Sequence, residues 1–163
     1  MKTLLLLRHA KAGDKDAADD HDRPLNARGK KEAPLIGQVL REQSLLPDII
    51  YSSDAKRCRR TVEKVAEAAG YHGETILTGE LYLAPAQAYY RLVNKISDEL
   101  RRVLVVGHNP TLETMVEAII SRYEPLPPAA LAHIEFEHLE RWSDFNEATP
   151  GRLVKLWQPM EVA

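Results

Sequence analysis

Two histidines follow the most apolar short runs of this chain. Leu4–Leu7 leads through an arginine into His9, and Val103–Val106 leads through a glycine into His108. A neutral imidazole can attack phosphorus and leave again, so a histidine held at the end of a strand can act as a covalent catalyst. Arg8 directly precedes His9, and a charged group beside a core strand requires a partner. These residues predict a site for an anionic, phosphate-bearing substrate.

Basic residues gather at the start of the helix predicted after Asp54. Lys56, Arg57, Arg59 and Arg60 all lie in its first turns, where the helix dipole disfavours positive charge. A bound anion would relieve this repulsion. We expect Arg57 to face the histidines and the other cations to form a solvated face. The planar fork of arginine stays charged and matches phosphate oxygens.

Asn109 and Pro110 begin another predicted helix. Asparagine is a good N-cap and proline a good first helical residue, and the free backbone N–H groups at such a start suit an anion. We therefore expect Asn109 to bind phosphate together with the arginines and histidines named above.

Short apolar runs alternate along the chain with helical patterns, so these residues depend on a layered framework. The predicted strands span 3–7, 48–51, 75–78, 102–106, 131–136 and 153–157, and the predicted helices span 28–43, 54–69, 85–96 and 110–120. Such alternation predicts a three-layer α/β/α sandwich with a central, mostly parallel sheet. In such a sheet ligands bind beyond the carboxyl ends of the strands, where both histidines would emerge. The proline-rich stretch 125–128 is expected to be a surface excursion.

The composition is that of an ordinary globular domain. The chain has 163 residues, of which 44% are hydrophobic, and a formal net charge of −2, which gives no reason to expect nucleic acid or a membrane as partner. The single cysteine, Cys58, allows no internal disulfide and fits a reducing compartment. The leucine run is too short for a signal peptide or a membrane span. These features predict a cytoplasmic, single-domain protein.

Taken together, the motifs resemble those of the histidine phosphatase superfamily. The residues that carry the resemblance are Leu7–Ala10, Asp22–Leu25 with Gly29, Ser52 and Ser53 with Arg57 and Thr61, and Val106–Asn109. The first resembles the Arg-His-Gly signature, with Ala10 in place of the usual glycine. The last two resemble the second arginine motif and the second-histidine motif. The order of the motifs and the short length are most similar to the small SixA-type phosphohistidine phosphatases.

The resemblance implies a phosphoglycerate mutase-like fold and a role for each matched residue. His9 would be the nucleophile that takes the phosphoryl group. Arg8, Arg57 and His108 would neutralise its oxygens by preorganised electrostatics. Arg23, in the loop before the first helix, would add a further phosphate contact. The resemblance implies no metal and no other cofactor.

The resemblance also bears on the substrate. Larger members of the superfamily place a carboxylic acid after the third strand, where this chain offers only Glu80 as a possible general acid. A phosphorylated imidazole needs less help to leave than an alkoxide does. We therefore expect residues 1–163 to form a single histidine phosphatase domain that hydrolyses phosphohistidine. Its partner would then be a phosphohistidine-bearing signalling or phosphotransfer protein.

Two alternatives stay open at this point. The chain could be a phosphatase or mutase acting on a small phosphorylated metabolite, or a phosphate-binding module without turnover. A cysteine phosphatase is rejected, because position 64, where its loop would need arginine, is Lys64. The acidic run 19–22 is interpreted as a solvated loop rather than a metal site.

Overall fold

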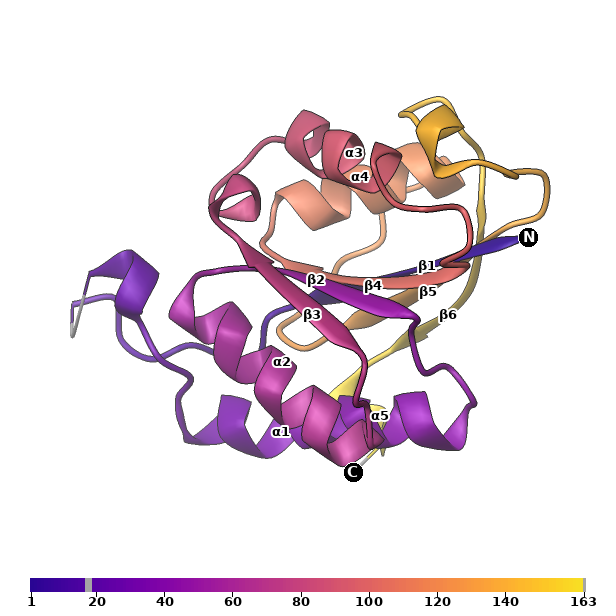
Figure 1. Cartoon of the computed structure of the whole chain (residues 1–163). Coiled ribbons are helices and arrows are strands. Elements are labelled where there is room, and N and C mark those ends of the chain that lie inside the picture. Colours follow the sequence, from indigo (N-terminus) through magenta and orange to yellow (C-terminus); the bar gives the residue numbers. More distant parts are fainter. Residues whose placement is uncertain (17–18, 163) are drawn as a thin grey trace.

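A six-stranded sheet forms the centre of the molecule, and the computed structural model describes residues 1–16 and 19–162 (Figure 1). The strands lie in the order β3-β2-β4-β1-β5-β6. The first four in this order pair in parallel, whereas β5 runs antiparallel to β1 and β6 antiparallel to β5. The strands are β1 (Lys2–Arg8), β2 (Ile49–Ser53), β3 (Glu74–Thr78), β4 (Arg102–Gly107), β5 (Leu131–Phe136) and β6 (Arg152–Trp157). The predicted α/β architecture with a mostly parallel sheet is confirmed.

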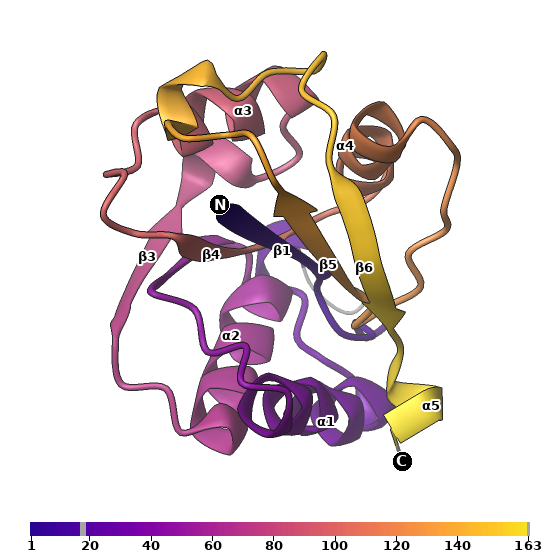
Figure 2. The ribbon, with the colours of Figure 1, turned by 90° about the vertical axis from the view of Figure 1, so that its right-hand side faces the viewer.

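Helices cover both faces of the sheet and make the outer two layers. Figure 1 shows α3 and α4 above the sheet and α1, α2 and α5 below it. Figure 2 shows β5 and β6 at the near edge, with the chain returning from β6 through α5 toward α1. The helices are α1 (Ala27–Glu42), α2 (Lys56–Ala69), α3 (Ala86–Asn94), α4 (Thr111–Ile120) and α5 (Pro159–Val162). Three short 3-10 turns are η1 (Asp20–Asp22), η2 (Gly79–Leu81) and η3 (Trp142–Asp144).

The leucines of β1 explain why its apolar run is continuous rather than alternating. Leu4 and Leu6 pack into the core under α3 and α4, whereas Leu5 and Leu7 pack into the core over α1 and α2. All four are fully buried. A strand covered on both faces needs apolar side chains at every position, which is the pattern of a central parallel strand.

A glycine allows α1 and α2 to approach closely. A Cβ built at Gly37 would lie 2.4 Å from the carbonyl oxygen of Val65 and 2.7 Å from the Cβ of Ala68. Any side chain there would push the two helices apart. The contact fixes α2 against α1, and α2 carries Arg57 at its start.

The carboxyl ends of β1, β2 and β4 meet at one edge of the sheet. Arg8 is in register with Gly107, and Ser52 with Val106. The chain therefore delivers His9, the start of α2 and His108 to the same edge, as expected of ligand-binding edges in parallel sheets. Among the described residues no helix combines the length and the apolar character needed to cross a membrane.

Candidate active site

His9 and His108 lie side by side at the carboxyl ends of two adjacent parallel strands. Their ring centroids are 5.3 Å apart, and the rings meet edge to face at 61°. Both residues are buried, with 8% and 5% of their surface exposed. The backbone N–H of His9 donates to the carbonyl of Gly107, which ties the ends of β1 and β4 together.

The tautomer of His9 is set by a backbone carbonyl. Its Nδ1 lies 2.8 Å from the carbonyl oxygen of Ala10, and because a carbonyl can only accept, Nδ1 carries the proton. Nε2 therefore keeps its lone pair. Burial, and after it the neighbouring charges of His108, Arg57 and Arg8, lower the pKa of His9 to about 3 despite the hydrogen bond to Ala10. His9 is a neutral imidazole at neutral pH, the form that can act as a nucleophile.

Ala10 replaces the glycine of the family signature without a backbone penalty. It is not among the residues with positive φ, so its conformation is open to any L residue. Its side chain is buried in the core between the sheet and α1 and α2. Its N–H donates to the hydroxyl of Thr61 at 3.0 Å.

The second histidine is neutral as well and has the opposite tautomer. The Arg57 guanidinium approaches its Nδ1 at 3.4 Å, and because arginine only donates, the proton of His108 is on Nε2. Nε2 lies 2.8 Å from the Ser53 hydroxyl. Burial, followed by the charge of Arg57, lowers the pKa of His108 to about 4. An anion in the cavity would counteract both effects and favour a second proton on Nδ1.

Arg57 is the cation at the start of α2 that faces the site. It is 3% exposed, and its two terminal nitrogens donate to the carbonyl and the carboxylate of Asp20, at 2.7 and 3.1 Å. Arg59 and Arg60 turn elsewhere, because they donate to the Asp54 carbonyl and to the Glu63 carboxylate. Of the four cations at the start of α2, only Arg57 lines the cavity described below, and the other three are half-buried rather than a fully solvated face.

Arg8 is held by a loop that the sequence placed on the surface. Its guanidinium donates to the carbonyl of Leu126 at 3.0 Å. Leu126 is 1% exposed, so the proline-rich stretch is not the simple surface excursion that was predicted. The N–H of Leu126 donates to the carboxylate of Glu113 at 2.7 Å, which fixes the peptide. Burial lowers the pKa of Arg8, and the charge of Glu113 opposes this shift.

Asn109 and Arg23 also line the site, and each is held there by its own hydrogen bonds. The side-chain amide of Asn109 donates to the carbonyl of Leu126 at 2.9 Å, and α4 begins after Pro110. The predicted capping role of Asn109 is wrong, because the N-cap of α4 is Pro110 and the side-chain oxygen of Asn109 accepts no hydrogen bond from the described residues. Arg23 donates to the carbonyl of Gly13 and to the carboxylate of Asp20, both at 3.2 Å.

These side chains line one cavity of about 440 Å³, which we call the phosphate cavity. Its lining residues are Arg8, His9, Lys11, Ala12, Lys15, Asp20, Arg23, Arg57, Leu83, His108, Asn109 and Pro128. Five of them are cationic and one is a carboxylate. Within the described chain, the Nε atoms of Arg8, Arg23 and Arg57 are buried and have no acceptor. Buried N–H groups without partners are costly, so three together indicate an anionic ligand.

Two residues singled out by sequence take no part in the lining. Glu80, the candidate general acid, is exposed in η2 and does not line the phosphate cavity. Cys58 is buried beneath His108, with its sulfur 3.5 Å from Nε2, and burial raises the pKa of its thiol to about 12. A thiol that stays protonated is no nucleophile. Over residues 1–16 and 19–162, no group of three or more His, Cys, Asp or Glu side chains could hold a metal ion.

Asp20 and Tyr82 are site residues that sequence reasoning missed. Asp20 lies in the acidic loop that was interpreted as solvated, and its carboxylate accepts hydrogen bonds from Arg57, Arg23 and the hydroxyl of Tyr82. The Tyr82 ring packs edge to face on His108 with centroids 5.7 Å apart. The only sequence signal was the position of Asp20 three residues before Arg23.

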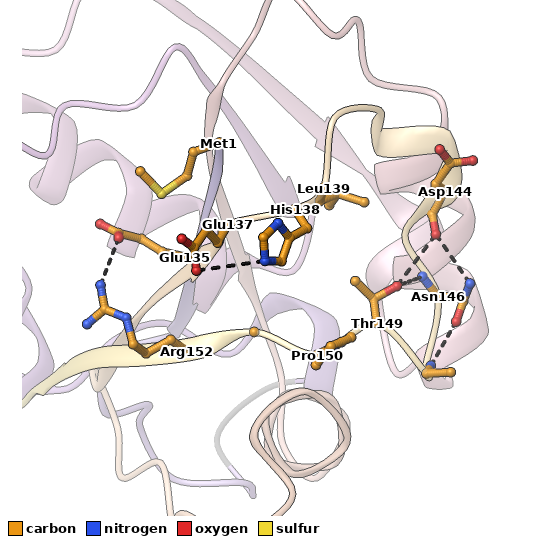
Figure 3. A pocket seen from close by; sticks show the side chains of 12 residues that line it. Met1, Glu135, Glu137, His138, Leu139, Asp144, Asn146, Thr149, Pro150 and Arg152 are labelled. Carbon is orange, nitrogen blue, oxygen red and sulfur yellow. Dashed lines mark hydrogen bonds and ion pairs between the residues drawn. The ribbon is translucent and has the colours of Figure 1, made fainter.

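A second and larger cavity, of about 710 Å³, lies at the amino end of β1, and we call it the amino-end groove (Figure 3). Its ionisable side chains belong to Glu135, Glu137, His138, Asp144 and Arg152. The guanidinium of Arg152 is paired with Glu135 at 3.1 Å, as the dashed line in Figure 3 shows. Carboxylates outnumber cations here, so the groove repels a phosphoryl dianion.

Comparisons with known proteins agree with this geometry. Residues 4–82 match the model of the histidine phosphatase superfamily (branch 1). An uncharacterised protein of Mycobacterium tuberculosis is 34% identical over 116 residues, which are 71% of this chain and 70% of that protein. The solved structure of the Agrobacterium tumefaciens protein assigned as the phosphohistidine phosphatase SixA is similar with a TM-score of 0.82 and 30% identity, covering 97% of this chain and 98% of that one.

A more distant structure shares the fold alone. The mycobacterial glucosyl-3-phosphoglycerate phosphatase superposes with a TM-score of 0.71 at 19% identity, over 96% of this chain and 98% of that one. The same framework therefore accommodates phosphatases whose names imply different substrates.

Proposed function

The chain belongs to the histidine phosphatase superfamily, and from this premise we propose that it acts as a single phosphatase domain with His9 as the phosphoryl acceptor. The reaction would proceed in two steps. His9 takes the phosphoryl group from the substrate, and water then hydrolyses the phosphohistidine. The proposal requires a neutral nucleophile, cations for the phosphoryl oxygens and an open path to solvent.

The single observation that carries the proposal is the convergence of one neutral histidine and three arginines on the phosphate cavity. His9 has a free Nε2, and Arg8, Arg23 and Arg57 each have a buried Nε–H without an acceptor in the described chain. Guanidinium groups bind phosphate oxygens through paired N–H donors. In a phosphoryl transfer the protein acts mainly by positioning and by stabilising charge, and this cavity offers both.

The proposed role of His108 is to support the charge that develops on the phosphoryl oxygens. Its proton is on Nε2, held toward Ser53. A bound dianion would favour a second proton on Nδ1, which faces Arg57. His108 would then donate to a phosphoryl oxygen as an imidazolium.

For the substrate we propose phosphohistidine on a signalling or phosphotransfer protein. Support comes from the similarity to the SixA-assigned structure at 30% identity. The mouth of the cavity also carries the exposed side chains of Lys11, Lys15 and Leu83, so a phosphorylated side chain can enter from outside. Glu80 lies outside the lining, and a phosphorylated imidazole depends less than an alkoxide on such an acid.

The test combines trapping with a substrate panel. The enzyme is mixed rapidly with a radiolabelled phosphohistidine peptide, quenched in base and checked for acid-labile label. We expect label on the wild type and none on His9→Ala. His138→Ala is the matched control, because His138 lies in the amino-end groove and is 93% exposed.

Turnover then identifies the substrate class. The kcat/KM for the phosphohistidine peptide is compared with values for phosphorylated sugars, glycerates and amino acids. A higher value for a metabolite ester would replace the protein substrate with a small molecule. Label absent from wild type, together with tight phosphate binding, would show a binding module instead.

A further inference from the structure

Asp20 is the one carboxylate among the described residues that line the phosphate cavity. We propose that Asp20 donates the proton to the leaving group, and later takes one from the attacking water. The inference rests on the proposed phosphatase function. It replaces Glu80, which the sequence offered as a possible acid, with a residue of the loop after β1, which Figure 1 shows beside the start of α2.

Asp20 lies on the side of the cavity where the leaving group of the substrate would be, opposite His9. In a phosphoryl transfer the attacking and leaving atoms lie roughly in line. His9 lies at the buried floor of the cavity, so the leaving atom must point toward the mouth. The side chain of Asp20 is 45% exposed, which places it on the solvent side. Its carboxylate lies 3.1 Å from a terminal nitrogen of Arg57, and that nitrogen lies 3.4 Å from Nδ1 of His108.

Three groups face Asp20 and keep it ionised. The Tyr82 hydroxyl donates to its carboxylate at 2.5 Å, Arg57 approaches from α2 and Arg23 from the adjoining loop. The hydrogen bond from Tyr82, followed by the charges of Arg57 and Arg23, holds the pKa of Asp20 at about 2. With cations on two sides, Asp20 is ionised and has no proton to give.

Substrate binding reverses this situation. A phosphoryl dianion takes over the N–H donors of Arg57 and Arg23, so Asp20 loses its cationic partners and faces two negative charges. Like charge nearby raises the pKa of a carboxyl group. The pKa of Asp20 therefore rises as the substrate enters, so that its carboxyl group can hold a proton while Tyr82 remains beside it. Asp20 would therefore act as an acid only when a phosphoryl group is bound.

The proposed steps balance as follows. Nε2 of His9 forms a bond to phosphorus, the bond from phosphorus to the leaving nitrogen or oxygen breaks, and the proton of Asp20 moves to that leaving atom. Water then attacks the phosphorus of phosphorylated His9, gives a proton to the Asp20 carboxylate, and the P–N bond breaks to release phosphate. No other reactant is required.

The neighbouring carboxylates are less suited to this role. Asp54 is bound to Nε2 of His21 at 2.8 Å and does not line the cavity. The side chain of Asp22 is 67% exposed and lies 3.8 Å from the other ring nitrogen of His21. Glu80 is exposed in η2. Geometry therefore selects Asp20 from the four.

The experiment measures how Asp20→Asn depends on the leaving group. Wild type, Asp20→Asn and the control Glu80→Gln are assayed on 4-nitrophenyl phosphate, phenyl phosphate and an alkyl phosphate. Proton donation contributes about 10²–10⁴-fold where the leaving group is poor, so we expect Asp20→Asn to lose about 100-fold or more on the alkyl ester. Its kcat/KM on 4-nitrophenyl phosphate should stay near wild type, and Glu80→Gln should match wild type throughout.

A pH profile and a conservative variant separate catalysis from positioning. The basic limb of kcat on the alkyl ester should disappear in Asp20→Asn, because no acid remains to be titrated. Asp20→Glu, which keeps a carboxyl group, should recover part of the lost turnover on that ester alone.

Two outcomes would overturn the inference while leaving the proposed function intact. One is an equal loss on every substrate, which would mean that Asp20 only orders the site. The other is a lower KM on every substrate, which would mean that Asp20 only competes with phosphate for Arg57. If the wild type turned over none of the substrates and took up no label on His9, the proposed function would fail first.

Discussion

The phosphate cavity and the amino-end groove lie at opposite ends of β1. The groove is the larger of the two, at about 710 Å³ against 440 Å³, but the phosphate cavity has more cationic side chains. The groove is lined by three carboxylates and by Arg152, whose guanidinium is already paired. The phosphate cavity has five cations and one carboxylate, with three guanidinium N–H groups free of acceptors in the described chain. The guanidinium N–H groups without acceptors therefore indicate the anion site better than cavity volume does.

The two cavities also differ in how firmly their side chains are held. In the phosphate cavity Arg57 is 3% exposed and donates to Asp20 through both terminal nitrogens. In the groove the side chain of His138 is 93% exposed and pairs loosely with Glu137, at 3.9 Å (Figure 3). Preorganised groups stabilise developing charge, whereas mobile surface groups must first be ordered.

The largest difference should appear in turnover. Arg57→Ala removes a preorganised cation, and we expect kcat/KM to fall about 10²–10³-fold, or about 3–4 kcal/mol in the transition state. Arg152→Ala in the groove should leave kcat/KM unchanged. Steady-state kinetics on a phosphoramidate substrate measure both. Equal losses in the two variants would contradict the assignment of the site.

Binding of inorganic phosphate should follow the same division. A ligand at 100 times its Kd stabilises the folded state by about 2.7 kcal/mol, which is readily seen as a shift in thermal unfolding. We expect wild type and Arg152→Ala to show the shift and Arg57→Ala to show a much smaller one at the same concentration. A shift that disappears in Arg152→Ala instead would place the anion in the groove.

The pH dependence of stability should distinguish the buried histidines from the exposed one. The pKa values of His9 and His108 are lowered to about 3 and about 4, so below pH 6.5 the unfolded chain binds protons that the folded chain excludes. The free energy of unfolding therefore falls as pH drops from 6.5 toward 4, by about 1–2 kcal/mol per histidine at pH 5.

Urea unfolding at pH 7 and pH 5 measures this dependence. His108→Gln should lose less stability between the two pH values than wild type, because one buried histidine is missing. His138→Gln, in the amino-end groove, should behave like wild type. The same loss in all three proteins would mean that the buried histidines do not set the acid sensitivity.

The smallest expected effect concerns the ion pair of the groove. Arg152 and Glu135 are 70% and 24% exposed, and such a pair contributes about 0.2–1 kcal/mol in water. Arg152→Ala should therefore lower the free energy of unfolding only slightly, and less at high salt. A loss of several kcal/mol in urea unfolding would show that the groove has a structural role that its exposure does not suggest.

Local patterns in the sequence predicted the framework well because they report on burial. The apolar run before His9 became β1 within a residue at each end, and the run before His108 became β4. Asp54 and Gly70 bracketed α2, whose cap residue Gly70 has the left-handed φ of 71° that favours glycine. The carboxyl ends of parallel strands lie at the same edge of a sheet, so the prediction of β1 and β4 also placed His9 and His108 at that edge.

Polar partners were predicted less well, because they depend on residues far apart in the chain. The carbonyl that holds Arg8 belongs to Leu126, 118 positions away, in a stretch that looked like a surface excursion. Asparagine is a common helix N-cap, yet the side-chain amide of Asn109 donates to the same Leu126 carbonyl. Asp20 looked like one acid of a solvated run until folding brought it to Arg57.

By itself the sequence determined the class of this protein: an α/β sandwich with two histidines and two arginines at the carboxyl edge of its sheet. These features follow from the local alternation of apolar and polar residues and from short motifs, which any conformation of the chain retains. Only the tertiary structure decided the tautomers of His9 and His108, the partners of Arg8 and the place of Asp20 in the cavity. Those depend on burial and on hydrogen bonds between distant segments, and neither exists until the chain has folded.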